Sequence, residues 1–473
     1  MGWLVRFIIM KNLLLVLFIV LSLPIMSQPI PQKLDSLLNS EILNSSEYGI
    51  TIFDLTDGNS IYRYQDQKLF RPASVEKIIT TVTAIDKLGE NYTFDTKVCY
   101  TGDIKDGTLN GNLYIIGGFD PEFMEKDMDM IVDAIKKSGI KHISDSLIFD
   151  VSMKDSAYWG PGWAWDDAGF SFQPYLSPLM VNRGCVDVTV YPMRRYKAPR
   201  IKSSPQSNYY KIINKAQSRN KGAGKLLAYR NYMDGGNDIT VSGNAAYITT
   251  KRVSVSNSAD FFVNLFVSKL SKEGINANSY EFGELLGDST STSLYTLQRP
   301  FQKVLDRALK KSDNLSAEAI LFNLAAKSSN KKRVGFKDGV EAINSFIKKS
   351  LGFNPTKYNI VDGCGISTYN YVSPELILEF LKYAYYHQNV FYSFYNGLPI
   401  AGVDGTMRNR LRNSEAHGNL RAKTGSLTGV SSLAGYVKAK NGHQYAFVII
   451  NQNFLSNKKA HIFQDKICNI LVE

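Results

Sequence analysis

The spacing of hydrophobic and polar residues changes several times along the chain, and each change predicts a different element. The first is an uncharged, mostly apolar stretch, residues 13–26, which follows two basic residues. A basic start and an apolar stretch too short to cross a bilayer comfortably are typical of a secretory signal. We therefore expect residues 1–27 to be a signal peptide that begins at Met1 or Met10, and the mature protein to be exported to the periplasm without a firm membrane anchor.

After the signal, helical and alternating patterns predict an α+β domain built from both ends of the chain. Residues 72–85, 301–327 and 459–472 place apolar side chains at helical spacing. The last of these helices has modest charge, so we expect it to pack on a core rather than on a membrane surface. Two pairs of strand-like segments predict hairpins: residues 48–53 with 60–64, and residues 429–438 with 444–451.

The middle of the chain is richer in short strands. Strand-like runs begin near residue 93, and between residues 187 and 255 they become short and polar, with Gly, Ser, Lys and Asn in the gaps. A chain of 473 residues is long enough for two or three domains. We predict a discontinuous domain of residues 28–92 and 289–473, an inserted domain of residues 93–186 and 256–288, and a small β-rich domain of residues 187–255.

Composition narrows the classes of function. Hydrophobic residues make up 44% of the chain and charged residues 21%, the balance of a globular protein. The formal net charge is +12, and removal of Arg6 and Lys11 with the signal lowers it to +10. A basic protein can meet nucleic acid, an anionic membrane or an anionic wall polymer, and export argues against nucleic acid.

The cysteines and histidines indicate no metal site. None of the five histidines has metal-ligand spacing or adjoins a nucleophilic serine elbow. We therefore expect neither a metal nor a cofactor, and a hydrolase here needs a base other than histidine. The four cysteines are too widely spaced for a zinc site or a dense disulfide framework, so we expect buried thiols or one bridge at most: Cys99, Cys185, Cys364 and Cys468.

One serine has such a base beside it. Ser74 and Lys77 are three residues apart on a predicted helix, so they share a face and the amine can reach the hydroxyl. Apolar Ile78 and Ile79 can desolvate the amine and lower its pKa, and the helix N-terminus favours negative charge on the serine. The spacing alone is weak evidence, because three other pairs share it: Ser138/Lys141, Ser345/Lys348 and Ser456/Lys459.

A second motif, Ser312-Asp313-Asn314, lies within the predicted helical run of residues 301–327. Ser312 can pass a proton between Lys77 and a leaving amine, and Asn314 can hold a backbone amide of the substrate. Taken alone, the motif is better explained as a helix cap, because Ser, Asp and Asn are the preferred N-cap residues.

A third motif, Lys423-Thr424-Gly425, precedes Ser426 and a predicted strand. A strand edge can pair with an extended peptide, and a glycine there permits close approach. Lys423 and Thr424 can bind a terminal carboxylate through charge-assisted hydrogen bonds. The backbone N–H groups of Ser426 and Ser74 can form an oxyanion hole.

The order of the three motifs is more specific than any one of them. Ser-x-x-Lys, Ser-Asp-Asn and Lys-Thr-Gly together form the signature of penicillin-binding proteins and class A β-lactamases. The chain resembles the low-molecular-mass class C penicillin-binding proteins, the D-alanyl-D-alanine carboxypeptidase/endopeptidase group. Five further segments carry this resemblance: residues 71–74, 111–121, 162–167, 362–374 and 398–411. The family usually has Ser where this chain has Cys364, which puts a thiol near the predicted site.

The resemblance implies a penicillin-binding transpeptidase domain, an antiparallel sheet flanked by helices, with two inserted β-rich domains. The inserts fit the 238 residues that separate Ser74 from Ser312. It also implies a Ser74 acyl-enzyme that cleaves D-Ala-D-Ala in peptidoglycan stem peptides and is acylated by β-lactam antibiotics. The first alternative, a serine β-lactamase, needs a glutamate between the second and third motifs, and the nearest, Glu341, is predicted to lie in a helix. The second alternative is a non-catalytic wall-binding or sensor protein, which has no need of all five residues Ser74, Lys77, Ser312, Asn314 and Lys423.

Overall fold

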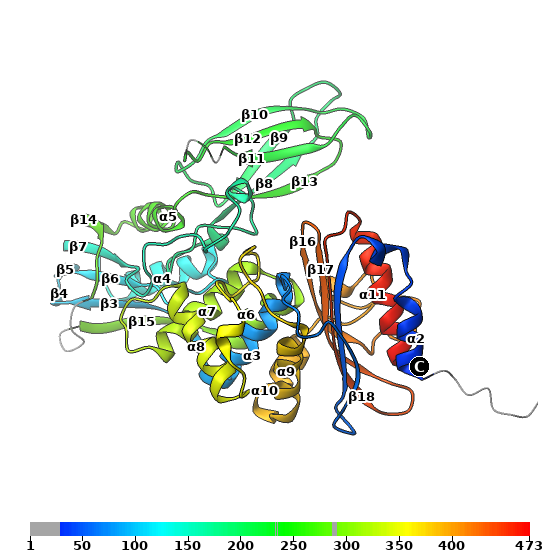
Figure 1. Cartoon of the computed structure of the whole chain (residues 1–473). Coiled ribbons are helices and arrows are strands. Elements are labelled where there is room, and N and C mark those ends of the chain that lie inside the picture. Colours follow the sequence, from blue (N-terminus) through cyan, green and yellow to red (C-terminus); the bar gives the residue numbers. More distant parts are fainter. Residues whose placement is uncertain (1–28, 232, 234, 286–290) are drawn as a thin grey trace, which may run out of the picture.

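The computed structural model describes residues 29–231, 233, 235–285 and 291–473. The predicted signal peptide lies outside the described residues. No helix among those residues is long and apolar enough to cross a membrane. The molecule consists of a helix-covered sheet, a second sheet beside it, and a small β-rich module that projects from the second sheet (Figure 1).

The first sheet joins the two ends of the chain. Its five antiparallel strands have the order β16-β17-β18-β1-β2. Both predicted hairpins are present, and β1 also pairs with β18 along its whole length. The strands are β1 (Glu47–Asp54), β2 (Asn59–Tyr64), β16 (Arg421–Leu427), β17 (Val430–Lys438) and β18 (Gln444–Gln452).

Helices cover both faces of this sheet. Along β18, Phe447 and Ile449 point to one face and Val448 and Ile450 to the other, and all four are fully buried. The predicted packing of the C-terminal helix on a core is confirmed. One face carries α2 (Ile30–Leu37) and α11 (Asn457–Val472). The other carries α9 (Pro374–Tyr386) and α10 (Gln388–Gly397), and behind them α3 (Glu76–Leu88), α6 (Phe301–Lys310), α7 (Asn314–Ser328) and α8 (Phe336–Lys349) complete the same core.

The predicted helical run of residues 301–327 is two helices rather than one. α6 ends at Lys310 and α7 begins at Asn314. Between them Ser312 has a φ of +55°, which a helix cannot contain. Asp313 is the N-cap of α7 and accepts a hydrogen bond from the Ser316 amide at 2.8 Å. The second motif therefore occupies a sharp turn, which the apolar spacing on either side concealed.

The inserted sheet is larger than predicted. It contains β3 (Thr93–Thr101), β4 (Asp103–Lys105), β5 (Thr108–Asn110), β6 (Leu113–Ile116), β7 (His142–Asp150), β14 (Asn276–Phe282) and β15 (Ser291–Pro300), packed against α4 (Glu125–Lys137) and α5 (Ser258–Lys272). Since β15 pairs with β3 through Pro300, the predicted limit at residue 288 falls short of the sheet's last strand. The polar residues of β15 hid this strand from the sequence pattern.

The small module comprises two three-stranded sheets. Their orders are β13-β8-β9 and β10-β12-β11. The strands are β8 (Cys185–Tyr191), β9 (Arg200–Ser204), β10 (Ile212–Gln217), β11 (Leu226–Arg230), β12 (Ile239–Asn244) and β13 (Thr249–Ser254). The fold class is thus the predicted transpeptidase-like domain with two β-rich insertions. All four cysteines are buried.

Candidate active site

Ser74 lies in a single 3-10 turn, η2 (Ala73–Val75), that leads into α3. The Nζ atom of Lys77 is 2.9 Å from the Oγ atom of Ser74, so the structure brings the first two predicted residues together. The Ser74 hydroxyl is partly exposed, whereas Lys77 is fully buried. A substrate can therefore reach the hydroxyl from solvent while the amine stays dry beneath it.

Lys77 has two further hydrogen-bond acceptors. Its Nζ atom is 2.8 Å from Oδ1 of Asn314 and 2.6 Å from the carbonyl oxygen of Cys364. Burial lowers the pKa of Lys77 below its ordinary value, although the acidic groups of Cys364, Asp362 and Glu318 oppose the shift. A buried amine with a lowered pKa beside a hydroxyl is suited to act as a general base.

A buried acidic cluster lies behind Lys77. Burial raises the pKa of Glu318 to about 8 and that of Glu76 well above its ordinary value. Both carboxylate oxygens of Glu318 accept the Gly363 amide, at 3.0 and 3.2 Å. Glu318, Asp362 and Cys364 could geometrically hold a cation, but both acids already accept hydrogen bonds from the protein. The cluster therefore serves as a support for the residue 362–367 turn.

Within the second motif, Asn314 contacts Lys77 whereas the Ser312 hydroxyl contacts Lys423. The Lys423 amine donates to Oγ of Ser312 at 2.8 Å and to the carbonyl of Thr424 at 2.6 Å. Burial lowers the pKa of Lys423 well below its ordinary value, and the charge of Lys77 lowers it further. The amide of Asn314 is engaged at both ends, because its Nδ2 donates to the carbonyl of Phe172 at 3.0 Å. Asn314 was expected to hold a backbone amide of the substrate, and its Nδ2 could do so only after its hydrogen bond to Phe172 breaks.

The third motif lies on edge strand β16, directly against the nucleophile. A Cβ atom on Gly425 would be 2.1 Å from Oγ of Ser432 and 2.9 Å from the amide nitrogen of Ser74. The glycine is thus required for β16 to pack against η2. The sequence predicted instead that it makes room for a substrate. Thr424 is half-buried, and its hydroxyl is 2.8 Å from that of Thr406.

The site thus contains Ser74 with Lys77, Ser312 with Lys423, and the edge strand β16 beside them. A model of the D-Ala-D-Ala carboxypeptidase 3 (S13) family matches residues 30–473. The chain belongs to this family. It is therefore a serine-type D-Ala-D-Ala carboxypeptidase, a penicillin-binding enzyme that acts on peptidoglycan, and the resemblance predicted from the motifs is confirmed.

Relatives of this carboxypeptidase are similar to it in sequence and in fold over most of their length. The D-alanyl-D-alanine carboxypeptidase DacB of Haemophilus influenzae is 26% identical over 437 residues, which cover 87% of this chain and 86% of the relative. The crystal structure of penicillin binding protein 4 (dacB) from the same organism superposes with a TM-score of 0.81 at 25% identity, over 92% of this chain and 98% of that one. A second structure of that protein, complexed with a β-lactam, has a TM-score of 0.72 at 23% identity, over 92% and 98% of the two chains.

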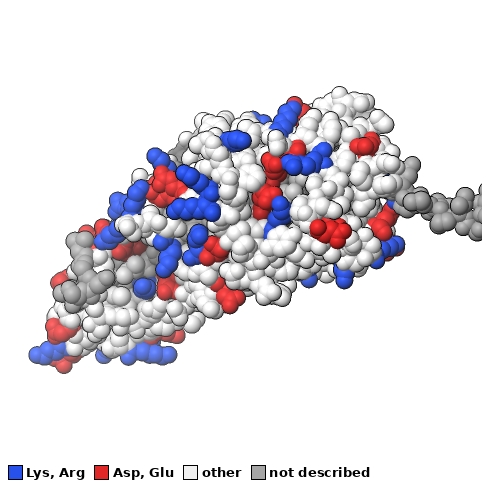
Figure 2. Space-filling model, turned by 60° about the horizontal axis from the view of Figure 1, so that its bottom comes forward, with Lys and Arg blue, Asp and Glu red and all other residues white. Residues whose placement is uncertain are grey.

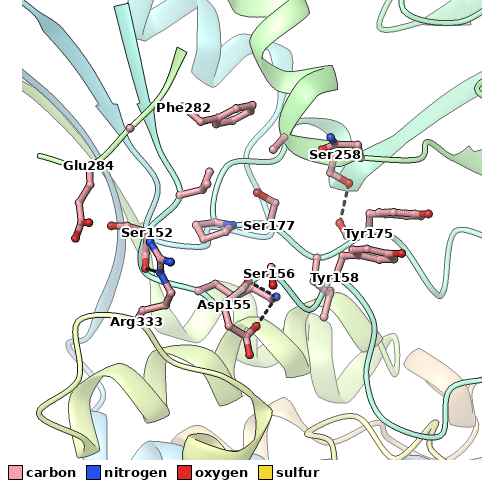
Figure 3. Close-up of a pocket in the computed structure, with 17 residues that line it drawn as sticks. Ser152, Asp155, Ser156, Tyr158, Tyr175, Ser177, Ser258, Phe282, Glu284 and Arg333 are labelled. Carbon is pink, nitrogen blue, oxygen red and sulfur yellow. Dashed lines mark hydrogen bonds and ion pairs between the residues drawn. The ribbon is translucent and has the colours of Figure 1, made fainter.

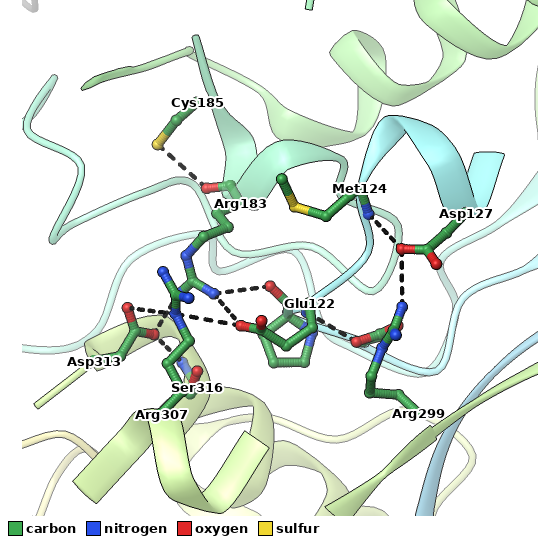
Figure 4. Close-up of polar contacts among 11 residues, drawn as sticks. Glu122, Met124, Asp127, Arg183, Cys185, Arg299, Arg307, Asp313 and Ser316 are labelled. Carbon is green, nitrogen blue, oxygen red and sulfur yellow. Dashed lines mark hydrogen bonds and ion pairs between the residues drawn. The ribbon is translucent and has the colours of Figure 1, made fainter. Parts of the chain in front are cut away.

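The insertion of the carboxypeptidase contacts the catalytic turn through Arg183, which the sequence did not single out. Its guanidinium forms an ion pair with Asp313 and lies 2.6 Å from Glu122, so one buried arginine links the second motif to the inserted domain (Figure 4). Arg307 reaches the same two carboxylates, at 3.3 Å from Glu122 and 3.7 Å from Asp313. These arginines hold the pKa of Asp313 below its ordinary value against the opposing effect of burial. No motif spacing in the sequence reveals Arg183.

Cys364 contributes its backbone and not its thiol to the site. The carbonyl accepts from Lys77, while the buried thiol lies 3.7 Å from Oδ2 of Asp362 and burial raises its pKa well above the ordinary value. The Ser-to-Cys departure therefore leaves Lys77 with the same backbone acceptor. The sequence pointed to this turn only through the family resemblance of residues 362–374, and that resemblance assigned no role to the turn.

A cavity of about 510 Å³ lies elsewhere, among the inserted segments (Figure 3). Tyr158 and Tyr175 stack along one side with ring centroids 4.4 Å apart, and Arg333 and Glu284 lie on the other. No residue of the three motifs lines it. The residues of the three motifs therefore lie apart from this cavity.

Proposed function

We propose that Ser74 is the acylated nucleophile and Lys77 its general base. Lys77 takes the hydroxyl proton as Ser74 attacks the carbonyl between two D-alanines of a stem peptide. The observation that carries this proposal is the 2.9 Å contact between Lys77 Nζ and Ser74 Oγ, with the amine buried. The backbone amides of Ser74 and Ser426 donate to the oxyanion, which the close packing of β16 on η2 supports.

The second Ser–Lys pair handles the leaving group. We propose that Ser312, hydrogen-bonded to Lys423, relays to the departing amine the proton that Lys77 took from Ser74, and that Lys423 and Thr424 bind the substrate's free carboxylate. Water then hydrolyses the acyl-enzyme, which releases the shortened peptide and restores the Ser74 hydroxyl. Asn314 holds Lys77 in place. A preference for a free carboxylate favours removal of terminal D-alanine, with cleavage of cross-links as a second activity.

The setting of this reaction is the cell envelope. The predicted signal peptide supports export to the periplasm, where stem peptides are available. We propose that β-lactams acylate Ser74 and deacylate slowly, because the amine stays covalently attached to the acyl group when the lactam ring opens and so remains in the site. The proposed mechanism uses no metal and no cofactor.

A fluorescent penicillin tests the nucleophile. Ser74→Ala should abolish covalent labelling and D-alanine release from a monomeric muropeptide. Ser345→Ala, a serine with the same spacing to a lysine on α8, should leave both unchanged. Labelling that survives in Ser74→Ala would overturn the assignment.

Two further readouts separate the alternatives. Fast turnover of nitrocefin would favour a β-lactamase, and tight muropeptide binding without D-alanine release would favour a sensor protein. Mass analysis of products from a cross-linked muropeptide measures the endopeptidase activity.

A further inference from the structure

The positive charge of the chain is concentrated in the small module. Residues 187–255 hold 13 Lys and Arg, three Asp and no Glu, a formal charge of +10 out of +12 for the whole chain. Elsewhere the signs are mixed: on the face seen in Figure 2, Lys and Arg side chains lie among Asp and Glu. A module that is basic in an otherwise nearly neutral protein indicates an anionic partner for that module.

Little of this charge is used to hold the module together. Arg252 pairs with Asp187 at 2.6 Å, and Arg230 is buried. Ten of the other eleven basic residues are exposed. The three aspartates are too few to neutralise them, so the module presents a net positive surface to solvent.

Three loops of the module meet at one end. They are residues 192–199 between β8 and β9, residues 218–225 between β10 and β11, and residues 245–248 between β12 and β13. The Tyr196 amide donates to the Ser218 carbonyl at 2.7 Å, which joins the first two loops. The Arg219 amide donates to Oδ1 of Asn244 at 2.9 Å, which joins the second to the third. We call these three loops the basic tip.

The basic tip lies at the free end of the module. The chain enters the module at Cys185, the start of β8, and leaves it after Ser254, the end of β13, whereas the tip lies at the opposite ends of those two strands. In Figure 1 the module stands clear of both larger sheets. None of the proposed catalytic residues belongs to the tip.

The tip combines basic and apolar side chains. Its loops contain six Lys and Arg and no Asp or Glu. They also hold four large apolar side chains in solvent: Met193 is 56% exposed, Tyr196 60%, Tyr247 56% and Ile248 68%. Such exposure costs free energy in water, and a partner that supplies an apolar phase recovers it.

We propose that the basic tip docks on the surface of an anionic phospholipid bilayer. The lysines and arginines are attracted to lipid phosphates, at roughly 1 kcal/mol for each residue near the surface. Tyr247 and Ile248 enter the boundary between headgroups and acyl chains, where aromatic and aliphatic side chains are favoured. A soluble anionic polymer would pair with the charge but would leave these apolar side chains in water, so the bilayer explains both features.

Co-sedimentation of the mature chain with lipid vesicles tests the proposal. We expect binding to vesicles with about a third phosphatidylglycerol, little binding to pure phosphatidylcholine, and a steep loss of binding as salt rises. The variant Arg195→Gln/Lys197→Gln/Lys221→Gln should bind about a hundredfold more weakly, from roughly 1 kcal/mol per residue. The matched control Lys202→Gln/Lys211→Gln/Lys215→Gln removes the same charge away from the tip and should change binding by about threefold or less.

A second variant distinguishes a bilayer from a soluble polyanion. Tyr247→Ser/Ile248→Ser should weaken vesicle binding at least tenfold but leave binding to heparin unchanged. Penicillin labelling of Ser74 should stay the same in every variant, which shows that each is folded. The proposal is overturned if the wild-type chain does not bind vesicles that contain phosphatidylglycerol, if the control variant loses as much vesicle binding as the tip variant, or if the apolar variant still binds vesicles fully.

Discussion

Lys77 Nζ has three hydrogen-bond partners, and the neutral form that the proposed general base requires would have only two hydrogens to give them. Asn314 Oδ1 and the Cys364 carbonyl can only accept, so they take both hydrogens. The lone pair then faces Ser74 Oγ, the one partner that carries a proton. The two acceptors thus orient the base as well as fixing its position.

Glu318 makes stability depend on pH in a defined direction. Its pKa is raised from 4.5 to about 8 in the folded protein, so between these pH values the folded state keeps a proton that the unfolded state releases. The free energy of unfolding therefore falls as pH rises through this window, by up to about 1.4 kcal/mol per pH unit for this group. We expect Glu318→Gln to flatten this dependence in urea unfolding. Glu341→Gln, at an exposed carboxylate on α8, should not, and equal slopes in all three proteins would contradict the assignment.

At the scale of elements, the site depends on how closely β16 packs against η2. Gly425→Ala should push the strand away from Ser74, because the new Cβ would collide with Ser432 Oγ and the Ser74 amide. We expect penicillin acylation to fall at least about a hundredfold, the size of an effect from a displaced oxyanion donor. Ser426→Ala, the next residue on the strand, keeps its backbone N–H and should retain activity. A large loss in Ser426→Ala would assign a role to the side chain instead.

The link between the inserted domain and α7 can be tested through Arg183. Arg183→Met leaves the partly buried Asp313 carboxylate with Arg307 as its remaining cationic neighbour, so we expect a lower melting temperature and slower acylation, by about tenfold or more. The double variant Arg183→Met/Asp313→Asn removes the uncompensated charge and should recover part of the stability. Lys311→Gln, an exposed residue beside the motif, is the control. No recovery in the double variant would show that the ion pair is not the source of the loss.

Sequence patterns correctly predicted the elements that have strong local signals. The Asn441-Gly442 hairpin and the helical spacing of Ser74 and Lys77 are both present, because turn chemistry and helical periodicity are local properties. The break at Ser312 was missed because apolar residues continue at helical spacing on both sides. Arg183 and the Cys364 carbonyl were missed because their roles depend on contacts between distant segments, and a backbone carbonyl has no signature in a sequence.

At the scale of the whole molecule, the buried cysteines are spread over the catalytic domain and the insertions. Cys99 and Cys185 lie in the insertions, Cys364 behind the active site, and Cys468 on the buried side of α11. Burial raises the pKa of Cys185 and of Cys468 to about 12. We expect the native protein to give no reaction with Ellman's reagent near neutral pH and the unfolded protein to give four thiols per chain. A thiol that reacts in the native protein would place an opening at that core.

The pairing of β1 with β18 has a consequence for biogenesis. Ser74 follows closely after β1, but the strand that completes the sheet beside β1 and the strand that presses against η2 are both made more than 340 residues later in synthesis. Until those last strands arrive, Lys77 has no dry site and Ser74 no oxyanion donors from β16. With the proposed nucleophile and oxyanion donors, we therefore expect an unfinished chain neither to cut the wall nor to be acylated by an antibiotic until its C-terminal hairpin is complete.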